Sequence, residues 1–131
     1  MLVDTSLWIE FLRGTGTIAS DYVREGLGEL ATSEPILMEL VAGAAPGRRS
    51  AGIERLLLSQ KWLRVEPGLD YRGAADVFQA SRASGHPPRS LQDCLIAAIA
   101  LRHGVAVAHR DADFEYIAAA TGLQTIDLRA R

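Results

Sequence analysis

The strongest indication of the fold is the segment SLQDCLIAAIALRHGVAVAHRD, residues 90–111. Ser90 can cap a helix that runs to about His103, and Gly104 can end it. The next four residues, Val105-Ala106-Val107-Ala108, form a short apolar run that is typical of a buried strand. A helix that leads directly into a buried strand belongs to a crossover connection, so this segment predicts a parallel sheet.

The same alternation of strands and helices continues on both sides of this segment. Further strands are expected at residues 2–3, 30–32, 62–65 and 123–126. Further helices are expected from a cap at Thr5 or Ser6 to Gly14, over 17–30, 33–42, 51–60 and 70–84, and through Phe114, Ile117 and Ala118 to Thr121. The helix over 70–84 is expected to turn inward Tyr71, Ala74, Ala75, Phe78 and Ala80. The pattern predicts one α/β domain over residues 1–131.

The composition is that of one folded domain with little net charge. The 131 residues, 48% of them hydrophobic, suffice for one sizeable core and are too few for two ordinary domains. A net charge of −2 argues against a protein that coats nucleic acid through a global basic field. It leaves room for an enzyme that meets phosphate locally, through a metal ion and a few arginines.

The single cysteine, Cys94, excludes an internal disulfide and a cysteine-based zinc site. It lies in an apolar helical segment and is expected to be a core residue. The first residues lack the basic region and apolar stretch of a signal peptide, and no apolar run approaches the roughly 18 residues of a membrane span. We therefore expect a reducing, cytoplasmic setting and no membrane segment.

Five acidic residues stand beside apolar segments of the expected core: Asp4, Glu39, Asp93, Asp111 and Asp113. A carboxylate against apolar surface is strongly destabilising unless it is paired or binds a cation. Asp4 follows the first strand, and Asp111 and Asp113 follow the fourth. Because parallel strands share one carboxyl edge, where ligands bind in the crevice, these acids should meet there. Asp93 and Glu39 would complete the group from two helices.

A divalent cation is the simplest means of keeping several carboxylates charged in one place. Without it, crowded carboxylates repel one another and raise each other's pKa values. Mg²⁺ binds through one or two carboxylates, keeps several waters and accepts phosphate oxygens from a substrate. The chemistry that this pattern indicates is metal-assisted hydrolysis of a phosphodiester.

Each acid taken alone also has a structural explanation. Asp4 is placed to cap a helix, and Asp93 ends a Ser-x-x-acid pattern close to a capping box. Asp111 and Asp113 can serve as loop or cap acids. Glu39, in the middle of a helix, gains nothing from capping, although it could point to solvent. The metal-site prediction therefore depends on the joint pattern.

The histidines give a weaker indication than the acids. His109 and Arg110 adjoin Asp111 and could reach a phosphate, although a surface loop explains them equally well. His86 and His103 lack the spacing of metal ligands and are expected to be structural or exposed.

Four short motifs along the chain each contain one or more of these acids in an apolar setting. They are LVDTSLWI (2–9), EPILMEL (34–40) with Gly43, SLQDCLIAA (90–98) and HRDADF (109–114). In this order they resemble the motifs of PIN-domain ribonucleases of the VapC toxin type, and the resemblance covers essentially the whole chain. It implies a PIN-like α/β fold, with a central, mostly parallel five-stranded sheet flanked by helices on both faces.

The resemblance also implies an activity and partners. The expected activity is Mg²⁺-dependent endoribonuclease cleavage, with Mn²⁺ as a possible substitute, by the toxin of a type II toxin–antitoxin module. The expected partners are RNA, a second copy of the chain in a homodimer, and a VapB-type antitoxin. The antitoxin's C-terminal tail would block the acidic groove, in a heterotetramer or a larger assembly.

By position, Asp4, Glu39 and Asp93 match the first three acids of the family. Asp111 and Asp113 both lie in the fourth motif, and we favour Asp111 as the nearer metal ligand, with Asp113 in support. The catalytic group implied is Asp4, Glu39, Asp93 and Asp111, and the metal ligands are Asp4, Asp93, Asp111 and Asp113. Glu39 would bind the metal directly or through water and orient the attacking water.

Four further residues are expected to support this site. Thr5 and Ser6 match the hydroxyl groups that often follow the first acid, where they would orient the metal ligands. Arg89 or Arg110 would hold the RNA backbone, because a guanidinium binds phosphate through two hydrogen bonds.

Two other functions fit parts of the pattern. Phosphoryl transfer through an aspartyl phosphate usually needs an acid two residues after the first, where this chain has Ser6, and a nearby lysine, for which only Lys61 is available. A non-catalytic module could use the same acidic groove to bind an Arg-rich peptide. Loss of Asp93 separates this module from an enzyme, because cleavage should vanish while peptide binding largely remains.

Overall fold

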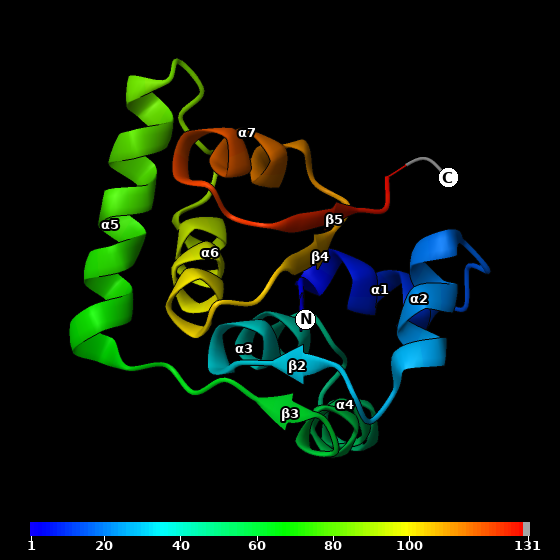
Figure 1. Ribbon diagram of the computed structural model, residues 1–131. Coiled ribbons are helices and arrows are strands. Elements are labelled where there is room, and N and C mark those ends of the chain that lie inside the picture. The colour runs from blue at the N-terminus through cyan, green and yellow to red at the C-terminus, as the bar shows by residue number, and fades with distance from the viewer. Residues whose placement is uncertain (130–131) are drawn as a thin grey trace.

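The chain folds around a five-stranded sheet with seven helices, which the computed structural model describes for residues 1–129 (Figure 1). The strands are β1 (Leu2–Val3), β2 (Ala31–Thr32), β3 (Lys61–Trp62), β4 (Val107–His109) and β5 (Thr125–Asp127). The helices are α1 (Thr5–Arg13), α2 (Ile18–Gly26), α3 (Glu34–Ala42), α4 (Arg48–Leu58), α5 (Pro67–Ala83), α6 (Leu91–His103) and α7 (Ala112–Thr121). Within residues 1–129, no helix combines the length and hydropathy of a membrane span.

The sheet is parallel in every pairing, with the strand order β3-β2-β1-β4-β5. This confirms the α/β fold and makes the sheet wholly parallel rather than mostly parallel. The chain adds β2 and β3 on one side of β1 and then returns to add β4 and β5 on the other. Leu2 lies opposite Val107 and Val3 opposite Ala108, so the carboxyl ends of β1 and β4 are neighbours at this reversal. A reversal of strand order opens the crevice in which such sheets bind ligands.

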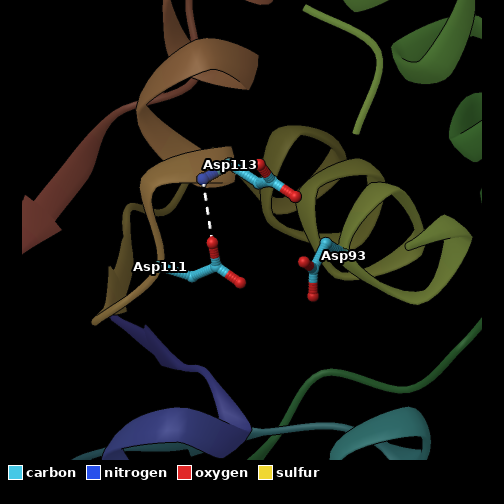
Figure 2. A group of neighbouring side chains, drawn as sticks. All are labelled: Asp93, Asp111 and Asp113. Atoms are coloured by element: carbon cyan, nitrogen blue, oxygen red, sulfur yellow. Dashed lines mark hydrogen bonds between the residues drawn. The ribbon is translucent and has the colours of Figure 1, made fainter. Parts of the chain in front are cut away.

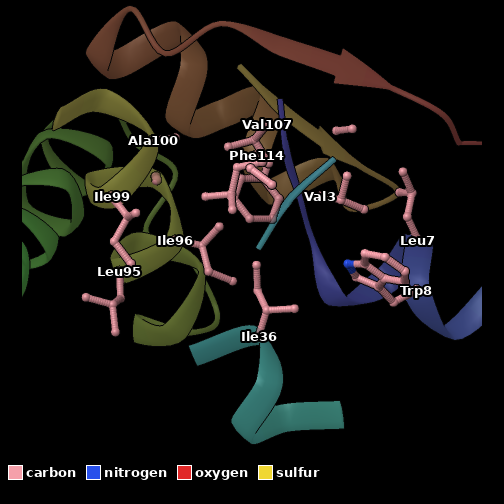
Figure 3. Close-up of a cluster of buried hydrophobic side chains, with 14 of the residues drawn as sticks. Val3, Leu7, Trp8, Ile36, Leu95, Ile96, Ile99, Ala100, Val107 and Phe114 are labelled. Carbon is pink, nitrogen blue, oxygen red and sulfur yellow. The ribbon is translucent and has the colours of Figure 1, made fainter. Parts of the chain in front are cut away.

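The core is a continuous cluster of buried apolar side chains between the helices and the sheet (Figure 3). Trp8 and Phe114 are its largest fully buried members, and Ile36 and Ile96 meet them from α3 and α6. Burial of each such side chain contributes about 1.5–3 kcal/mol to folding. Residues 94–100 of α6 are all buried, because α5 packs along the side of α6 that faces away from the sheet (Figure 1). Cys94 is therefore a core residue, as expected.

Two helices differ from the ranges expected from the sequence. α2 stops at Gly26 instead of residue 30, because Gly28 has a φ of +90° and its N–H donates to Gln60 Oε1 at 2.8 Å. α4 begins at Arg48 instead of residue 51 and ends at Leu58 instead of residue 60. The segment expected to be a loop, residues 44–50, is thus helical in its last part.

α5 differs both in its start and in its buried face. It begins at Pro67 instead of residue 70, because proline suits a first helical turn and Glu66 accepts the N–H of Gly68 at 3.0 Å. Its buried positions include Ala74, as expected, and Val77, which was not expected. Tyr71 and Ala75 are exposed, so that part of the expected inner face was wrong.

The last two strands begin later than expected. Gly104, with a φ of +66°, ends α6, and Val105 N donates back to Ala100 O at 3.0 Å. This hydrogen bond and the left-handed Gly104 form the C-terminal cap of α6, so β4 begins only at Val107. β5 shifts with it to Thr125–Asp127, because Thr125 lies opposite Val107.

Candidate metal centre

Asp4 stands where β1 ends and α1 begins, and it is almost completely buried. Its N–H donates to Ala108 O of β4 at 2.9 Å, which fixes it at the reversal of the sheet. Its carboxylate accepts from Ser6 N at 3.1 Å and Ser6 Oγ at 2.6 Å, so Asp4, and not Thr5 or Ser6, caps α1. Burial raises the pKa of Asp4 in spite of these hydrogen bonds, and repulsion from Glu39 adds to the rise.

Asp93 lies in the first turn of α6 and is half-buried. Burial is the main cause that raises the pKa of Asp93 to about 7. Repulsion raises it further, from Asp4, Asp111, Glu39 and Asp113. Asp93 therefore lies within electrostatic reach of the other four acids. A strongly shifted carboxyl group in a crevice is a feature of functional sites.

Three of the acids come together closely enough to share one cation. One oxygen from each of Asp93, Asp111 and Asp113 lies within 4.8 Å of the other two. Figure 2 shows these side chains pointing toward a common space: Asp93 comes from α6, Asp111 from the turn before α7, and Asp113 from the first turn of α7. Asp111 also caps α7 by accepting the N–H of Asp113 at 2.9 Å. Carboxylate oxygens are the ligands that Mg²⁺ and Mn²⁺ prefer, so this donor set fits a divalent cation.

Glu39 is exposed on α3, yet its side chain is held in one orientation. Its Oε1 accepts hydrogen bonds from Thr5 Oγ1 and from Gln92 Nε2, both at 3.0 Å. The Gln92 amide also donates to Pro35 O at 2.8 Å. Thr5 thus supports an acid, as expected, whereas the contact from Gln92 was not expected. Its place immediately before Asp93 was the one available indication.

Ser6 connects the two strand ends that carry the acids. Its hydroxyl donates to Asp4 Oδ2 at 2.6 Å and accepts the N–H of Arg110 at 3.1 Å. The end of β1 is therefore fixed to the turn that precedes Asp111. A small hydroxyl at this position supports two acids at once, which fits the expected supporting role of Ser6.

Both arginines expected near the phosphate are engaged by carboxylates. Arg89 reaches the acid cluster, where its Nη2 lies 3.0 Å from Asp111 Oδ1 and its Nε 3.2 Å from Asp113 Oδ2. Arg110 turns to the other side and pairs with Glu10, with Nη1 2.7 Å from Oε1. The structure therefore brings Arg89, but not the Arg110 guanidinium, into direct contact with the acids.

His109 is fully buried, so neither a phosphate contact nor a surface loop describes it. Its Nδ1 accepts the N–H of Asp111 at 3.0 Å, and its Nε2 lies 2.7 Å from Glu115 Oε2. His86 and His103 are exposed, as expected, and neither is in the acid cluster. His109 therefore supports an acid from beneath the site.

Lys61 lies far from the acids in the sheet. It begins β3, the edge strand, two positions from β1, and its Nζ pairs with Glu29 at 2.8 Å. An aspartyl-phosphate reaction would need a lysine near the acidic pocket. The one lysine of the chain does not provide it.

A groove of about 330 Å³ borders the acid site at Glu39. It lies against α1, α3 and α4, and its other lining residues are Ile9, Leu12, Arg13, Leu40, Gly43, Ala44, Arg49 and Ile53. Its size exceeds that of a metal ion with its waters, so the site has room for part of a larger ligand beside the acids.

Comparison with known proteins agrees with this geometry. The family model for the PIN domain matches residues 1–120. The chain is 44% identical over 133 residues to "VapC ribonuclease Mb1587" of Mycobacterium bovis and to "Ribonuclease VapC11" of Mycobacterium tuberculosis. Each of these matches covers 98% of this chain and 99% of the relative.

Solved structures share the fold over nearly the same length. The DNA-bound VapBC of Salmonella typhimurium contains a chain that superposes with a TM-score of 0.75 at 18% identity, covering 97% of this chain and 96% of that one. A chain of VapBC-5 from Mycobacterium tuberculosis superposes with a TM-score of 0.65 at 26% identity, and the match covers 96% of each chain. The first likeness concerns the fold alone, whereas the family match and the end-to-end relatives concern the sequence as well. This chain therefore belongs to the PIN-domain family and, within it, to the VapC group.

Proposed function

We propose that this protein is a divalent-metal-dependent endoribonuclease and the toxin of a type II toxin–antitoxin module, acting as a single domain over residues 1–131. The observation that carries the proposal is the convergence of Asp93, Asp111 and Asp113 at the reversal of the sheet. It occurs in a chain that is 44% identical, end to end, to proteins named as ribonucleases. An acidic oxygen site in such a crevice suits hydrolysis of a phosphodiester.

The acids have two roles in this proposal: four of them bind the metal ion, and Glu39 orients the attacking water. Asp93, Asp111 and Asp113 would hold Mg²⁺ or Mn²⁺, with Asp4 beside them at the end of β1. A bound cation of this kind polarises a phosphoryl oxygen and lowers the pKa of water. Glu39 Oε1 is occupied by Thr5 and Gln92, so Glu39 Oε2 would orient the attacking water and accept its proton.

The RNA backbone would meet the arginines beside the acids. Arg89 and Arg110 remain the candidates, because a guanidinium matches a phosphate with two parallel hydrogen bonds. Each must first leave a carboxylate: Arg89 leaves Asp111 and Asp113, and Arg110 leaves Glu10. The groove beyond Glu39 offers space for the nucleotides on one side of the cleaved bond.

The proposed partners follow from proteins of the same fold. Several are chains of complexes described as VapBC, and one is FitAB bound to a DNA fragment. These complexes support a cognate VapB-type antitoxin for this chain, and a homodimer that forms a heterotetramer or a larger assembly with it. A toxin that cleaves cellular RNA would act in the cytoplasm.

One observation favours a second function, that of an acidic groove for an Arg-rich peptide. The cluster already accepts a guanidinium, because Arg89 donates to both Asp111 and Asp113. An arginine from a partner could make the same contacts. This binding would accompany the enzyme as its inhibition, or replace catalysis altogether.

The deciding experiment is cleavage of total cellular RNA by the purified, antitoxin-free chain. Reactions would contain Mg²⁺, Mn²⁺ or EDTA, with Asp93→Asn prepared in parallel to detect contaminating nucleases. We expect discrete products from the wild-type protein with metal, and none with EDTA or from the variant. Equal cleavage by both proteins would reject Asp93 as a catalytic residue. No cleavage by a correctly folded wild-type chain, together with tight binding of an Arg-rich peptide, would favour the binding module.

A further inference from the structure

Arg89 occupies the acid cluster with its side chain. Its Nη2 donates to Asp111 Oδ1 at 3.0 Å, and its Nε donates to Asp113 Oδ2 at 3.2 Å. These are two of the three carboxylates whose oxygens converge with Asp93. The guanidinium therefore satisfies the same acceptor groups that a divalent cation would use.

The two parts of Arg89 are held with different firmness. Its main-chain N–H donates to Asp113 Oδ2 at 3.0 Å, which fixes the backbone before α6. Its side chain is 76% exposed, whereas the side chains of Asp111 and Asp113 are 30% and 12% exposed. Exposed ion pairs are weak, and an arginine side chain has many rotamers. The guanidinium can thus leave the acids while the backbone and both carboxylates stay in place.

We propose that Arg89 is an internal counter-ion, which neutralises Asp111 and Asp113 in the metal-free protein and is displaced when a divalent metal binds them. The inference rests on the proposed metal-dependent function. A cation of charge +2 on Asp93, Asp111 and Asp113 repels the guanidinium and takes over its acceptors. The displaced side chain is then free beside the metal, where the RNA phosphate would lie.

The opposite role, a permanent contact that orients the acids for the metal, gives the opposite result on mutation. If Arg89 competes with the metal, its removal strengthens metal binding. If Arg89 orients the ligands, its removal weakens metal binding, as loss of supporting groups usually does. The metal affinity of the isolated chain therefore distinguishes the two roles without any RNA.

The first experiment is a titration of the metal-free chain with Mn²⁺, followed by calorimetry or by the paramagnetic signal of free Mn²⁺. The variants are Arg89→Gln, Arg89→Lys and Arg110→Gln, the last of which removes a nearby arginine that pairs with Glu10 instead of the cluster. Because exposed ion pairs are modest, we expect Arg89→Gln to bind Mn²⁺ roughly three- to tenfold more tightly. Arg89→Lys should fall between Arg89→Gln and wild type, and Arg110→Gln should stay within about twofold of wild type.

The second experiment observes the displacement directly. Arginine labelled with ¹⁵N gives an Nε–H resonance for Arg89, identified by its absence in Arg89→Gln. Addition of diamagnetic Mg²⁺ should move this resonance toward that of a solvated arginine, while the Arg110 resonance stays in place. An Arg89 resonance that does not change at saturating Mg²⁺ would overturn the proposal.

The outcomes separate this inference from the proposed function. Unchanged or weaker Mn²⁺ binding by Arg89→Gln, or equal strengthening in Arg110→Gln, overturns the counter-ion role and leaves the ribonuclease intact. Absence of Mn²⁺ and Mg²⁺ binding in every protein, wild type included, would overturn the metal centre itself and the inference with it.

Discussion

His109 Nδ1 accepts a hydrogen bond from the main-chain N–H of Asp111 at 3.0 Å. Because Nδ1 accepts, the ring proton of the neutral imidazole is on Nε2, which donates to Glu115 Oε2 at 2.7 Å. Thr125 Oγ1 of β5 donates to the same Glu115 oxygen at 2.6 Å. The turn that presents Asp111 is therefore fixed from below by a buried side chain.

This relationship predicts different effects for two substitutions of His109. His109→Leu removes the acceptor of the Asp111 N–H, and should weaken Mn²⁺ binding by about 10–100-fold, the usual effect of losing a group that orients a ligand. His109→Asn places an amide oxygen near the position of Nδ1 and should retain more of the affinity. Both variants lose the Glu115 contact, so their thermal stabilities provide the structural control. Equal Mn²⁺ affinities for the Leu and Asn variants would show that the Asp111 hydrogen bond is unimportant.

Gln92 offers a test of the orientation of Glu39. Gln92→Ala removes one of the two donors to Glu39 Oε1, so Glu39 should sample other rotamers and the cleavage rate should fall about tenfold. The melting temperature should fall only modestly, because the hydrogen bond to Glu39 is exposed and the one to Pro35 O is only partly buried. Gln79→Ala, an exposed glutamine on α5, is the matched control and should retain full activity. A normal rate in Gln92→Ala would remove Gln92 from the site.

The convergence of the acids could be predicted because it depends on backbone rules. Asp4 and Asp111 follow apolar strands, and parallel strands place their carboxyl ends at one edge of the sheet. The side-chain partners of these acids could not be predicted in the same way. Arg89 meets Asp113, 24 residues away, and Gln92 meets Glu39, 53 residues away. Such contacts depend on how helices pack, which periodicity does not specify.

His109 and α5 show the same limit in the core. A histidine beside an arginine and an aspartate has the composition of a surface turn, yet Glu115 supplies a polar partner that allows its complete burial. On α5, Asp70 is buried and Tyr71 exposed, the reverse of what hydrophobicity suggests. The partner of Asp70 is Arg102 on α6, which the local sequence of α5 does not reveal.

Burial of Asp93, together with repulsion from the other acids, should make the metal-free protein less stable as pH rises. The pKa of Asp93 is about 7 in the folded chain, against an ordinary value of 3.8. Between these values the folded state keeps a proton that the unfolded chain releases, so stability falls as pH rises through this window. The stability of Asp93→Asn should lack this dependence on pH. Near pH 8 in EDTA the variant should melt a few degrees higher than the wild-type protein, because a change of about 1 kcal/mol in the free energy of unfolding shifts Tm by roughly 3–5 °C.

The measurement is thermal unfolding of both proteins from pH 4 to pH 8 in EDTA. A wild-type Tm that matches that of Asp93→Asn at every pH would contradict the raised pKa of Asp93. Saturating Mn²⁺ should make the wild-type protein the one with the higher Tm, because a ligand at 100 times its Kd stabilises the folded state by about 2.7 kcal/mol. This increase should be absent or much smaller in Asp93→Asn.

The ion pair between the buried Asp70 and the partly exposed Arg102 should be a main support of the contact between α5 and α6. Asp70 is 1% exposed, and its two oxygens accept from Arg102 Nε at 2.7 Å and Nη2 at 2.8 Å. Arg102 Nη2 also donates to Arg64 O at 2.9 Å, and Glu66 N donates to Asp70 at 2.7 Å. Burial would raise the pKa of Asp70, but the hydrogen bonds from Arg102 and Glu66 outweigh it and hold the pKa below 3.8.

Asp70→Asn should therefore lower the free energy of unfolding by about 3 kcal/mol at pH 7, because it leaves the Arg102 charge without its partner. Asp76→Asn, which breaks the exposed pair with Arg72 on the same helix, should change it by less than about 0.5 kcal/mol. Urea unfolding with an unchanged m-value measures the free energy of unfolding of both variants.

The stabilising effect of Asp70 should also depend on pH. Since the pKa of Asp70 is lowered in the folded state, its contribution to stability is complete above the pKa of the unfolded chain and is lost as pH falls through the folded value. The difference between wild type and Asp70→Asn should thus shrink below about pH 4. A difference that persists unchanged at pH 2 would mean that shape, and not charge, accounts for the stability.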